Sequence, residues 1–85
     1  MRIEYEKELF VCSRLRHMGF AHGSKVKLYG DEFDLESNPH PQGSQYVIEA
    51  ISHRSGDLRR ISLPMSITGL IEREFDVMDK IKIAA

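Results

Sequence analysis

Hydrophobic positions recur at steps of three and four residues near both ends of the chain, which is the spacing of one face of an α-helix. In residues 4–18 these positions are Tyr5, Leu9, Cys12, Leu15 and Met18. Acidic residues gather at the start of this segment and basic residues at its end, an order that suits the helix dipole, and Gly19 follows in the position of a C-terminal cap. We therefore predict a helix over residues 4–18. A strand stays open as the alternative for residues 2–11, because apolar and charged residues also alternate there.

A second helical stripe follows Pro64, and most charged residues of this segment fall outside it. Its members are Ile67, Leu70, Ile71, Phe75 and Met78. Ser66 is the expected N-cap, so we predict a helix from there to about residue 79. Apolar residues of the segment 75–83 also alternate in strand phase, and a closing or edge strand stays open as the alternative.

Between these segments, apolar and polar residues alternate with the period of a β-strand. Folded about a two-residue turn at Gly30-Asp31, residues 25–36 form a hairpin with apolar pairs on one face and opposite charges on the other. The expected pairs are Leu28–Phe33, Val26–Leu35, Lys27–Asp34 and Lys25–Glu36.

Residues 46–63 form a second hairpin in the same way, about a two-residue Ser55-Gly56 loop. The expected pairs are Arg54–Asp57, Ala50–Ile61 and Ile48–Leu63, with Glu49 and Arg60 as diagonal neighbours. The segment 38–43 between the hairpins is predicted to be a loop, because its two prolines lack the N–H that a strand ladder needs and its glycine permits unusual backbone angles.

The resulting order is helix, four strands, helix, which predicts an α+β fold. We expect a small antiparallel sheet of two β-hairpins, with one apolar face covered by the N-terminal and C-terminal helices. If the sheet curls on itself, the same order gives a small SH3-like open barrel.

The segment Leu15–Val26 places Met18-Gly19-Phe20 and then Gly23 ahead of Val26. It resembles the strand-entry segment of the small SH3-like domains in bacterial ferrous-iron transport proteins, where a Leu-Gly-Phe and a Gly precede a Val-rich strand. Those domains carry the segment later in the chain, and the remaining sequence departs from theirs. The resemblance implies support for a barrel, and no function is carried over from it.

The length of 85 residues predicts a single domain over residues 1–85. A chain of this size buries only about 60 to 65% of its unfolded surface, so we expect a thin core and a shallow functional surface in place of a deep active site. No apolar run approaches a membrane span, the N-terminal residues are highly charged, and there is one cysteine. We place the chain in the cytoplasm, with no membrane partner.

Histidine and cysteine residues are the first candidates for catalysis or metal binding. The four histidines show neither the i, i+4 helical pair nor the compact Cys/His spacing of a metal site. Cys12 lies on the apolar stripe of the first helix, where core packing is its expected role. We therefore expect no catalytic residue, no metal and no cofactor, and hence a protein that is not an enzyme.

Charge is distributed unevenly along the chain, although the net charge is only −1. Residues 31–36 are acidic, whereas the second hairpin is basic over residues 53–60, with three arginines against a single aspartate. We expect these two charged surfaces to bind a partner. The candidate partner-binding residues are Arg54, Arg59, Arg60, Asp31, Glu32 and Asp34.

The leading hypothesis is a small non-enzymatic binding or regulatory protein that acts through protein–protein contact, as an inhibitor or adaptor of bacterial or mobile-element type. The alternative is a nucleic-acid-binding module that uses the basic hairpin 53–60, since two-stranded ribbons enter grooves and arginine binds phosphate or guanine. A homodimer built on Met65, Met78 and the strand-like termini is a further alternative.

Overall fold

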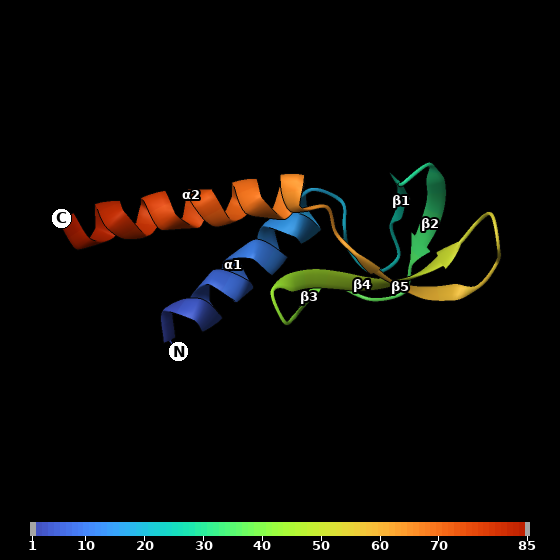
Figure 1. Ribbon diagram of the computed structural model, residues 1–85, viewed down its shortest axis with the longest axis horizontal. Helices are drawn as coiled ribbons and strands as arrows, with labels where there is room; N and C mark the ends of the chain where they lie inside the picture. The colour runs from blue at the N-terminus through green and yellow to red at the C-terminus, as the bar shows by residue number, and fades with distance from the viewer. Residues whose placement is uncertain (1, 85) are drawn as a thin grey trace.

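The computed structural model describes the backbone of residues 2–84 and the side chains of residues 5–78. Within that part of the chain, two helices flank a five-stranded antiparallel sheet, so the α+β prediction is confirmed (Figure 1). The helices are α1 (Arg2–His17) and α2 (Met65–Ala84). The strands are β1 (Lys25–Leu28), β2 (Asp31–Leu35), β3 (His40–Gln42), β4 (Gln45–Ser52) and β5 (Leu58–Ser62).

The long strand β4 organises the sheet. It pairs with β5 along one edge, and with β2 and β3 one after the other along the opposite edge, while β1 pairs with the outer side of β2. The helices lie together at one end of the molecule, and the β1–β2 and β4–β5 hairpins lie at the other (Figure 1).

The sheet is not closed into a barrel, so the SH3-like alternative and the barrel implied by the resemblance are wrong. Within residues 2–84, β1 pairs only with β2 and β5 pairs only with β4. A side-chain hydrogen bond links the β1–β2 turn to β5, because the Tyr29 hydroxyl donates to the Ser62 carbonyl at 2.8 Å.

The N-terminal helix is confirmed, and the strand alternative for residues 2–11 is wrong. Gly19 has a φ of 108° and donates its N–H to Arg16 O, while Phe20 N–H donates to Leu15 O. These two bonds form a Schellman motif, which agrees with the predicted glycine cap.

The predicted stripe of α1 is buried only in part. Cys12 and Leu15 are buried as predicted, whereas Tyr5, Leu9 and Met18 are exposed. Val11, outside the stripe, is fully buried, and α2 packs along the helix with the rings of Phe10 and Phe75 5.5 Å apart. Ion pairs Lys7–Asp76 (3.1 Å) and Arg14–Glu74 (3.2 Å) border this contact.

The C-terminal helix is confirmed, and the strand alternative for residues 75–83 is wrong. The helix begins at Met65, and the Pro64 carbonyl accepts the N–H groups of Ile67 (3.0 Å) and Thr68 (3.1 Å). Ser66 therefore lies inside the first turn and is not the N-cap. Of the predicted stripe, Ile71 is buried, while Leu70 and Met78 are exposed.

Both hairpins exist, but each is shifted by two residues from the predicted register. In the first, Val26 pairs with Phe33 and Leu28 with Asp31, so the turn is Tyr29-Gly30. Both turn residues have positive φ (51° and 76°), as a type I′ turn requires. The predicted pairs Leu28–Phe33, Val26–Leu35, Lys27–Asp34 and Lys25–Glu36 are wrong, since Lys27 lies opposite Glu32 and Lys25 opposite Asp34.

In the second hairpin, Ile48 pairs with Ile61 and Glu49 with Arg60. Ser52 N–H donates to Asp57 O at 3.1 Å, so the loop is longer than the predicted Ser55-Gly56. The predicted pairs Arg54–Asp57, Ala50–Ile61 and Ile48–Leu63 are wrong. Glu49 and Arg60, expected to be diagonal neighbours, lie directly opposite each other.

The predicted loop over residues 38–43 is also wrong in part, because β3 forms within it. Pro41 lies opposite Tyr46, and Gly43, with a φ of 62°, opens the turn into β4. Proline is tolerated here because β3 is a short edge strand whose outer side needs no ladder bond.

One hydrophobic core connects the inner face of the sheet with the helices. It contains Val11, Leu15 and Phe20 from the N-terminal part, Leu35, Ile48 and Leu63 from the sheet and Ile71 from α2. No helix in residues 2–84 is long and apolar enough to cross a membrane.

The observed register of the first hairpin can be tested with paired cysteines. Lys27 and Glu32 form a non-hydrogen-bonded pair, whose Cα atoms lie about 4.5 Å apart, within reach of a disulfide. We expect Lys27→Cys with Glu32→Cys to oxidise in air, leaving only the Cys12 thiol. The matched pair Lys27→Cys with Asp34→Cys, diagonal in this register and about 7 to 8 Å apart, should keep all its thiols. Thiol titration of the denatured proteins distinguishes the registers. A disulfide in the Lys27/Asp34 pair and free thiols in the Lys27/Glu32 pair would support the Gly30-Asp31 turn instead.

The packing of β4 gives a stability prediction. Ile48 is 0% exposed, so Ile48→Ala should lower the free energy of unfolding by about 2 to 5 kcal/mol, measured by urea denaturation. Leu58→Ala on the neighbouring strand is the control, because Leu58 is 62% exposed and its truncation should change stability by no more than about 0.5 kcal/mol. Equal losses in the two variants would contradict the assigned core.

Candidate functional site

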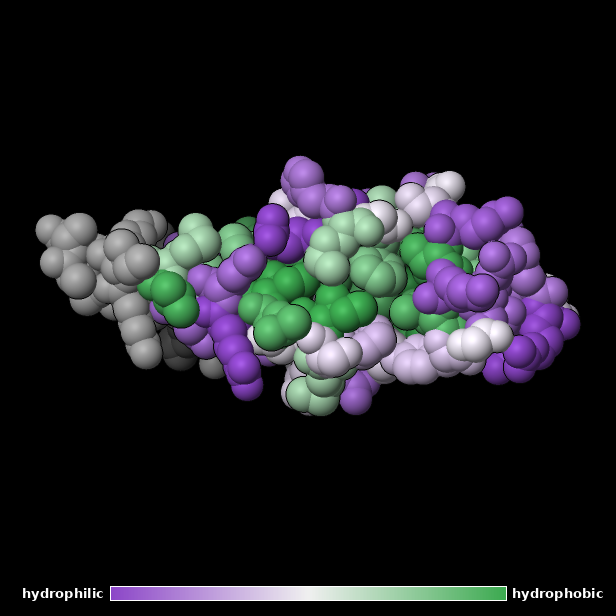
Figure 2. Space-filling model, turned by 90° about the horizontal axis from the view of Figure 1, so that it is seen from above, coloured by the Kyte–Doolittle hydropathy of each residue, from purple (hydrophilic) through white to green (hydrophobic). Residues whose placement is uncertain are grey.

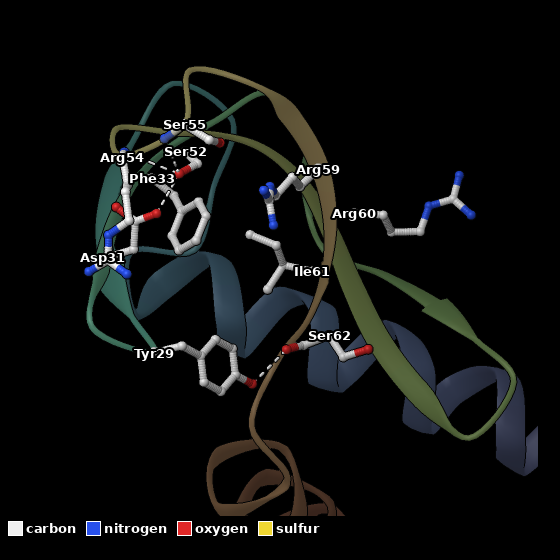
Figure 3. A pocket seen from close by; sticks show the side chains of 10 residues that line it. All are labelled: Tyr29, Asp31, Phe33, Ser52, Arg54, Ser55, Arg59, Arg60, Ile61 and Ser62. Atoms are coloured by element: carbon white, nitrogen blue, oxygen red, sulfur yellow. Dashed lines mark hydrogen bonds between the residues drawn. The ribbon is translucent and has the colours of Figure 1, made fainter.

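The strongest candidate site is an open pocket of about 610 Å³ between the β1–β2 turn on one side and β5 with its preceding loop on the other (Figure 3). We call it the basic pocket. It is lined by Tyr29, Asp31, Phe33, Ser52, Arg54, Ser55, Arg59, Arg60, Ile61 and Ser62.

The floor of the basic pocket is apolar. Phe33 from β2 and Ile61 from β5 point into the space between the hairpins (Figure 3), and only 6% and 9% of these residues are exposed. They belong to the same inner face as Ile48, which lies opposite Ile61 in the sheet. The pocket is therefore the solvent-facing end of the core, where an apolar group could be removed from water.

The three predicted arginines do not share one surface. Arg59 lies on the inner face of β5 and points into the pocket, whereas Arg60 points away from it (Figure 3). Arg60 donates to Glu49 at 2.9 Å and to Gln42 at 3.3 Å. Successive side chains of a strand point to opposite faces, so adjacent arginines on β5 are separated by the sheet itself.

The two arginines at the pocket also differ in their contacts. Arg54 donates from Nη2 to the Gly30 carbonyl at 2.9 Å, which connects the loop before β5 to the β1–β2 turn. In the part of the chain that the structure describes, Arg59 has no ion-pair partner. Arg59 is therefore the pocket arginine whose side chain has neither an ion pair nor a hydrogen bond among the described residues.

Asp31 forms one wall of the pocket and is held in place by Ser52. The buried Ser52 hydroxyl donates to the Asp31 carboxylate, and its oxygen accepts the N–H groups of Arg54 and Ser55, each at 3.2 Å. The hydrogen bond from Ser52, with smaller contributions from the Glu32 N–H and from Arg54, lowers the pKa of Asp31. One serine thus joins the loop, the turn and the pocket wall.

Glu32 and Asp34, the other two predicted acidic residues, lie outside the pocket. Both flank His53, whose Nε2 is 3.0 Å from Asp34 and whose Nδ1 is 3.7 Å from Glu32. The structure therefore brings Arg54, Arg59 and Asp31 together. It keeps Arg60 at the rim of the pocket with its guanidinium turned away, and it places Glu32 and Asp34 elsewhere.

The sequence reasoning missed Tyr29, Phe33, Ile61 and Ser52 as site residues. The sequence pattern predicts Phe33 and Ile61 as core residues of the hairpins. Where the core opens to solvent depends on the register, which the pattern does not give. The one local signal was Tyr29 beside Gly30, a pair that can form a type I′ turn and present an aromatic ring at its corner.

A second hollow lies on the helical side of the molecule. Seen from above, apolar residues gather over the middle of the molecule, and hydrophilic residues cover the end that carries the hairpins (Figure 2). The hollow is a groove of about 220 Å³ beside α1 and α2, lined by Met18, Ile67, Leu70 and Ile71 with Arg14 and Glu74. Its two charged residues, Arg14 and Glu74, pair with each other at 3.2 Å, so the basic pocket is the better candidate.

Metal and thiol chemistry find no support among the described residues. No group of three or more His, Cys, Asp or Glu side chains within them is arranged to hold a metal ion. Burial raises the pKa of the Cys12 thiol, which keeps it protonated, and the residue packs in the core as predicted.

Comparison of the chain with protein-family models, with curated proteins and with solved structures finds no match. The chemistry of the site therefore has to be argued from its own residues.

The wall residue Asp31 gives a pH-dependent prediction. Its pKa is lower in the folded chain than the ordinary value of 3.8, so the ionised carboxylate stabilises the fold above that pH. This contribution is lost as the pH falls through the lower, folded-state value. We expect Asp31→Asn to reduce the urea midpoint at neutral pH, and the difference from the wild-type chain to shrink well below pH 3.8.

Asp57→Asn, in the exposed loop before β5, is the matched control for this measurement. It should leave the midpoint nearly unchanged at both pH values. A difference between wild type and Asp31→Asn that stays constant with pH would show that the carboxylate charge is not the stabilising feature.

Proposed function

We propose that this chain is a non-enzymatic protein-binding module, an adaptor or inhibitor, whose basic pocket takes an acidic segment of a partner protein. The observation that carries the proposal is Arg59, an arginine without an ion-pair partner among the described residues, directed over the apolar floor of Phe33 and Ile61. Such a site can bind a carboxylate and bury an adjacent apolar side chain in one step.

The chemistry of arginine favours a carboxylate ligand. Its planar guanidinium can bind both oxygens of Asp or Glu at once, and these charge-assisted bonds are about twice as strong as neutral ones. The floor contributes apolar burial of roughly 25 cal/mol per Å². Because Arg59 lies at an open rim, its charge should mainly accelerate association and make binding sensitive to salt.

The non-enzymatic character is supported by the lining of the pocket. Its described residues contain three serines but no histidine and no cysteine. Ser52 is buried, donates to Asp31 and accepts the N–H groups of Arg54 and Ser55, so its hydroxyl is not open to a substrate.

Nucleic acid is the alternative occupant, with Arg59 on a phosphate and the exposed ring of Tyr29 as a stacking surface. One observation favours a protein. The arginines of the basic hairpin are divided between the two faces of the sheet, so they do not form one continuous positive surface for a phosphate backbone.

The proposal is tested by selecting a phage-displayed library of random peptides against the wild-type chain. We expect the enriched peptides to combine Asp or Glu with an aliphatic residue. For a synthetic version of one such peptide, Arg59→Ala should weaken binding at least about tenfold, about 1.4 kcal/mol, measured by fluorescence anisotropy. Added salt should weaken binding to the wild-type chain more than to the variant.

Arg73→Ala is the matched control, because Arg73 is an exposed arginine on α2 and its removal changes the net charge equally. It should leave the affinity unchanged. Equal losses in both variants, or enriched peptides without acidic residues, would refute the proposal. A single-stranded oligonucleotide that binds through Arg59 while no acidic peptide does would establish the nucleic-acid alternative in its place.

A further inference from the structure

We infer that the partner segment binds as an additional β-strand along the outer edge of β5, between β5 and the β1–β2 turn. The inference rests on the proposed function and specifies how the basic pocket would hold its ligand. It draws on the backbone of β5, on the Tyr29 bridge and on the distribution of charge along the edge.

The backbone of β5 has an unused edge. In an antiparallel pair, hydrogen-bonded and non-hydrogen-bonded residues alternate. Ser52–Asp57 and Tyr46–Leu63 are bonded pairs, which makes Ala50–Arg59 and Ile48–Ile61 bonded as well. Leu58, Arg60 and Ser62 therefore direct their N–H and C=O groups away from β4, toward the pocket side of the strand.

Only one of these outward-facing backbone groups has a hydrogen-bond partner among the described residues. The Ser62 carbonyl accepts the Tyr29 hydroxyl, and within residues 2–84 no other strand pairs with this edge. The edge thus presents a row of backbone donors and acceptors of the kind that an extended peptide completes.

The Tyr29 bridge also indicates the width of the gap. An extended tyrosine side chain with its 2.8 Å hydrogen bond spans roughly two strand spacings of about 4.8 Å each. In Figure 3 this side chain reaches across the pocket from the β1–β2 turn to β5. One strand fits into a gap of that width, and on entering it would take the Ser62 carbonyl from Tyr29.

Charge complementarity identifies an acidic segment as the occupant. Two copies of this chain joined antiparallel along β5 would bring Arg59 and Arg60 of one copy close to those of the other, and like charges opposed across strands are destabilising. An acidic segment would instead place negative charges opposite these arginines. Arg59 and Ile61 share the inner face, so the segment needs Asp or Glu at one inner position and an aliphatic residue two positions away.

The probe for this inference is the synthetic peptide Thr-Thr-Asp-Thr-Val-Thr-Thr, which has that spacing, and binding is followed by NMR on the full chain. In the free chain, the amide protons of Leu58 and Arg60 should exchange rapidly with solvent. Saturating peptide should slow their exchange at least about tenfold. The amides of Arg59 and Ile61, already bonded to β4, are the internal control and should change little.

Two further changes test the backbone and the bridge. N-methylation of the Asp and Val amides in one series, or of the Thr amide between them in the other, should weaken binding at least about tenfold in at least one series, because one set of N–H groups faces β5. Tyr29→Phe keeps the ring but releases the Ser62 carbonyl, so it should tighten binding severalfold.

The possible results separate the inference from the proposed function. Binding that depends on Arg59 while Leu58 and Arg60 remain unprotected, or that tolerates both N-methylated series, overturns strand addition and leaves the proposed function in place. Failure of this peptide and of every library-derived acidic peptide to bind overturns both. Protection of the Leu58 and Arg60 amides with loss of binding on N-methylation supports both.

Discussion

The fold depends on the burial of β4, since three of the other four strands described in residues 2–84 pair directly with it. Its inner residues Ile48 and Ala50 are 0% exposed, and the helices pack on the same core. In residues 2–84 the sheet stays open, because β1 pairs only with β2 and β5 only with β4, so the core is not covered on all sides. The uncovered end is the basic pocket, and the candidate site is a direct consequence of the open sheet.

The faces of both hairpins could be predicted from the sequence, but their registers could not. Alternation has a period of two, so a shift of two residues leaves every side chain on its predicted face and alters only its partner. The turns decide between such registers. Tyr29 adopts a positive φ, unusual for a residue other than glycine, and its hydroxyl bond to Ser62 helps to hold it there. The hydrogen bond from Ser52 holds Asp31 in β2, outside the turn. Both contacts join residues far apart in the chain, which local patterns do not encode.

The helices illustrate the same division between local and long-range information. Composition, dipole and the Gly19 cap predicted α1, because these properties act within a few residues. The inward face followed from periodicity only in part. Cys12 and Leu15 of the predicted stripe are buried, but Tyr5 and Leu9 are exposed and Val11, outside the stripe, is buried. The contact with α2 decides the choice. For the candidate site, the arginines were visible as a charge cluster, but their separation required knowing that they lie on a strand.

That separation gives the adjacent arginines of β5 two different physical roles. Arg60, on the outer face, has its charge balanced by Glu49, its cross-strand neighbour, and this pair stabilises the β4–β5 ladder where both residues meet solvent. Arg59, on the inner face, has no such neighbour because the residue opposite it is Ala50. An alanine leaves the guanidinium without a carboxylate and leaves space beside the apolar floor. An unpaired positive charge on a sheet edge discourages pairing between copies of the same chain, while it attracts a strand of opposite charge. In the proposed binding mode, the same residue would protect the edge from self-association and select the strand that completes it.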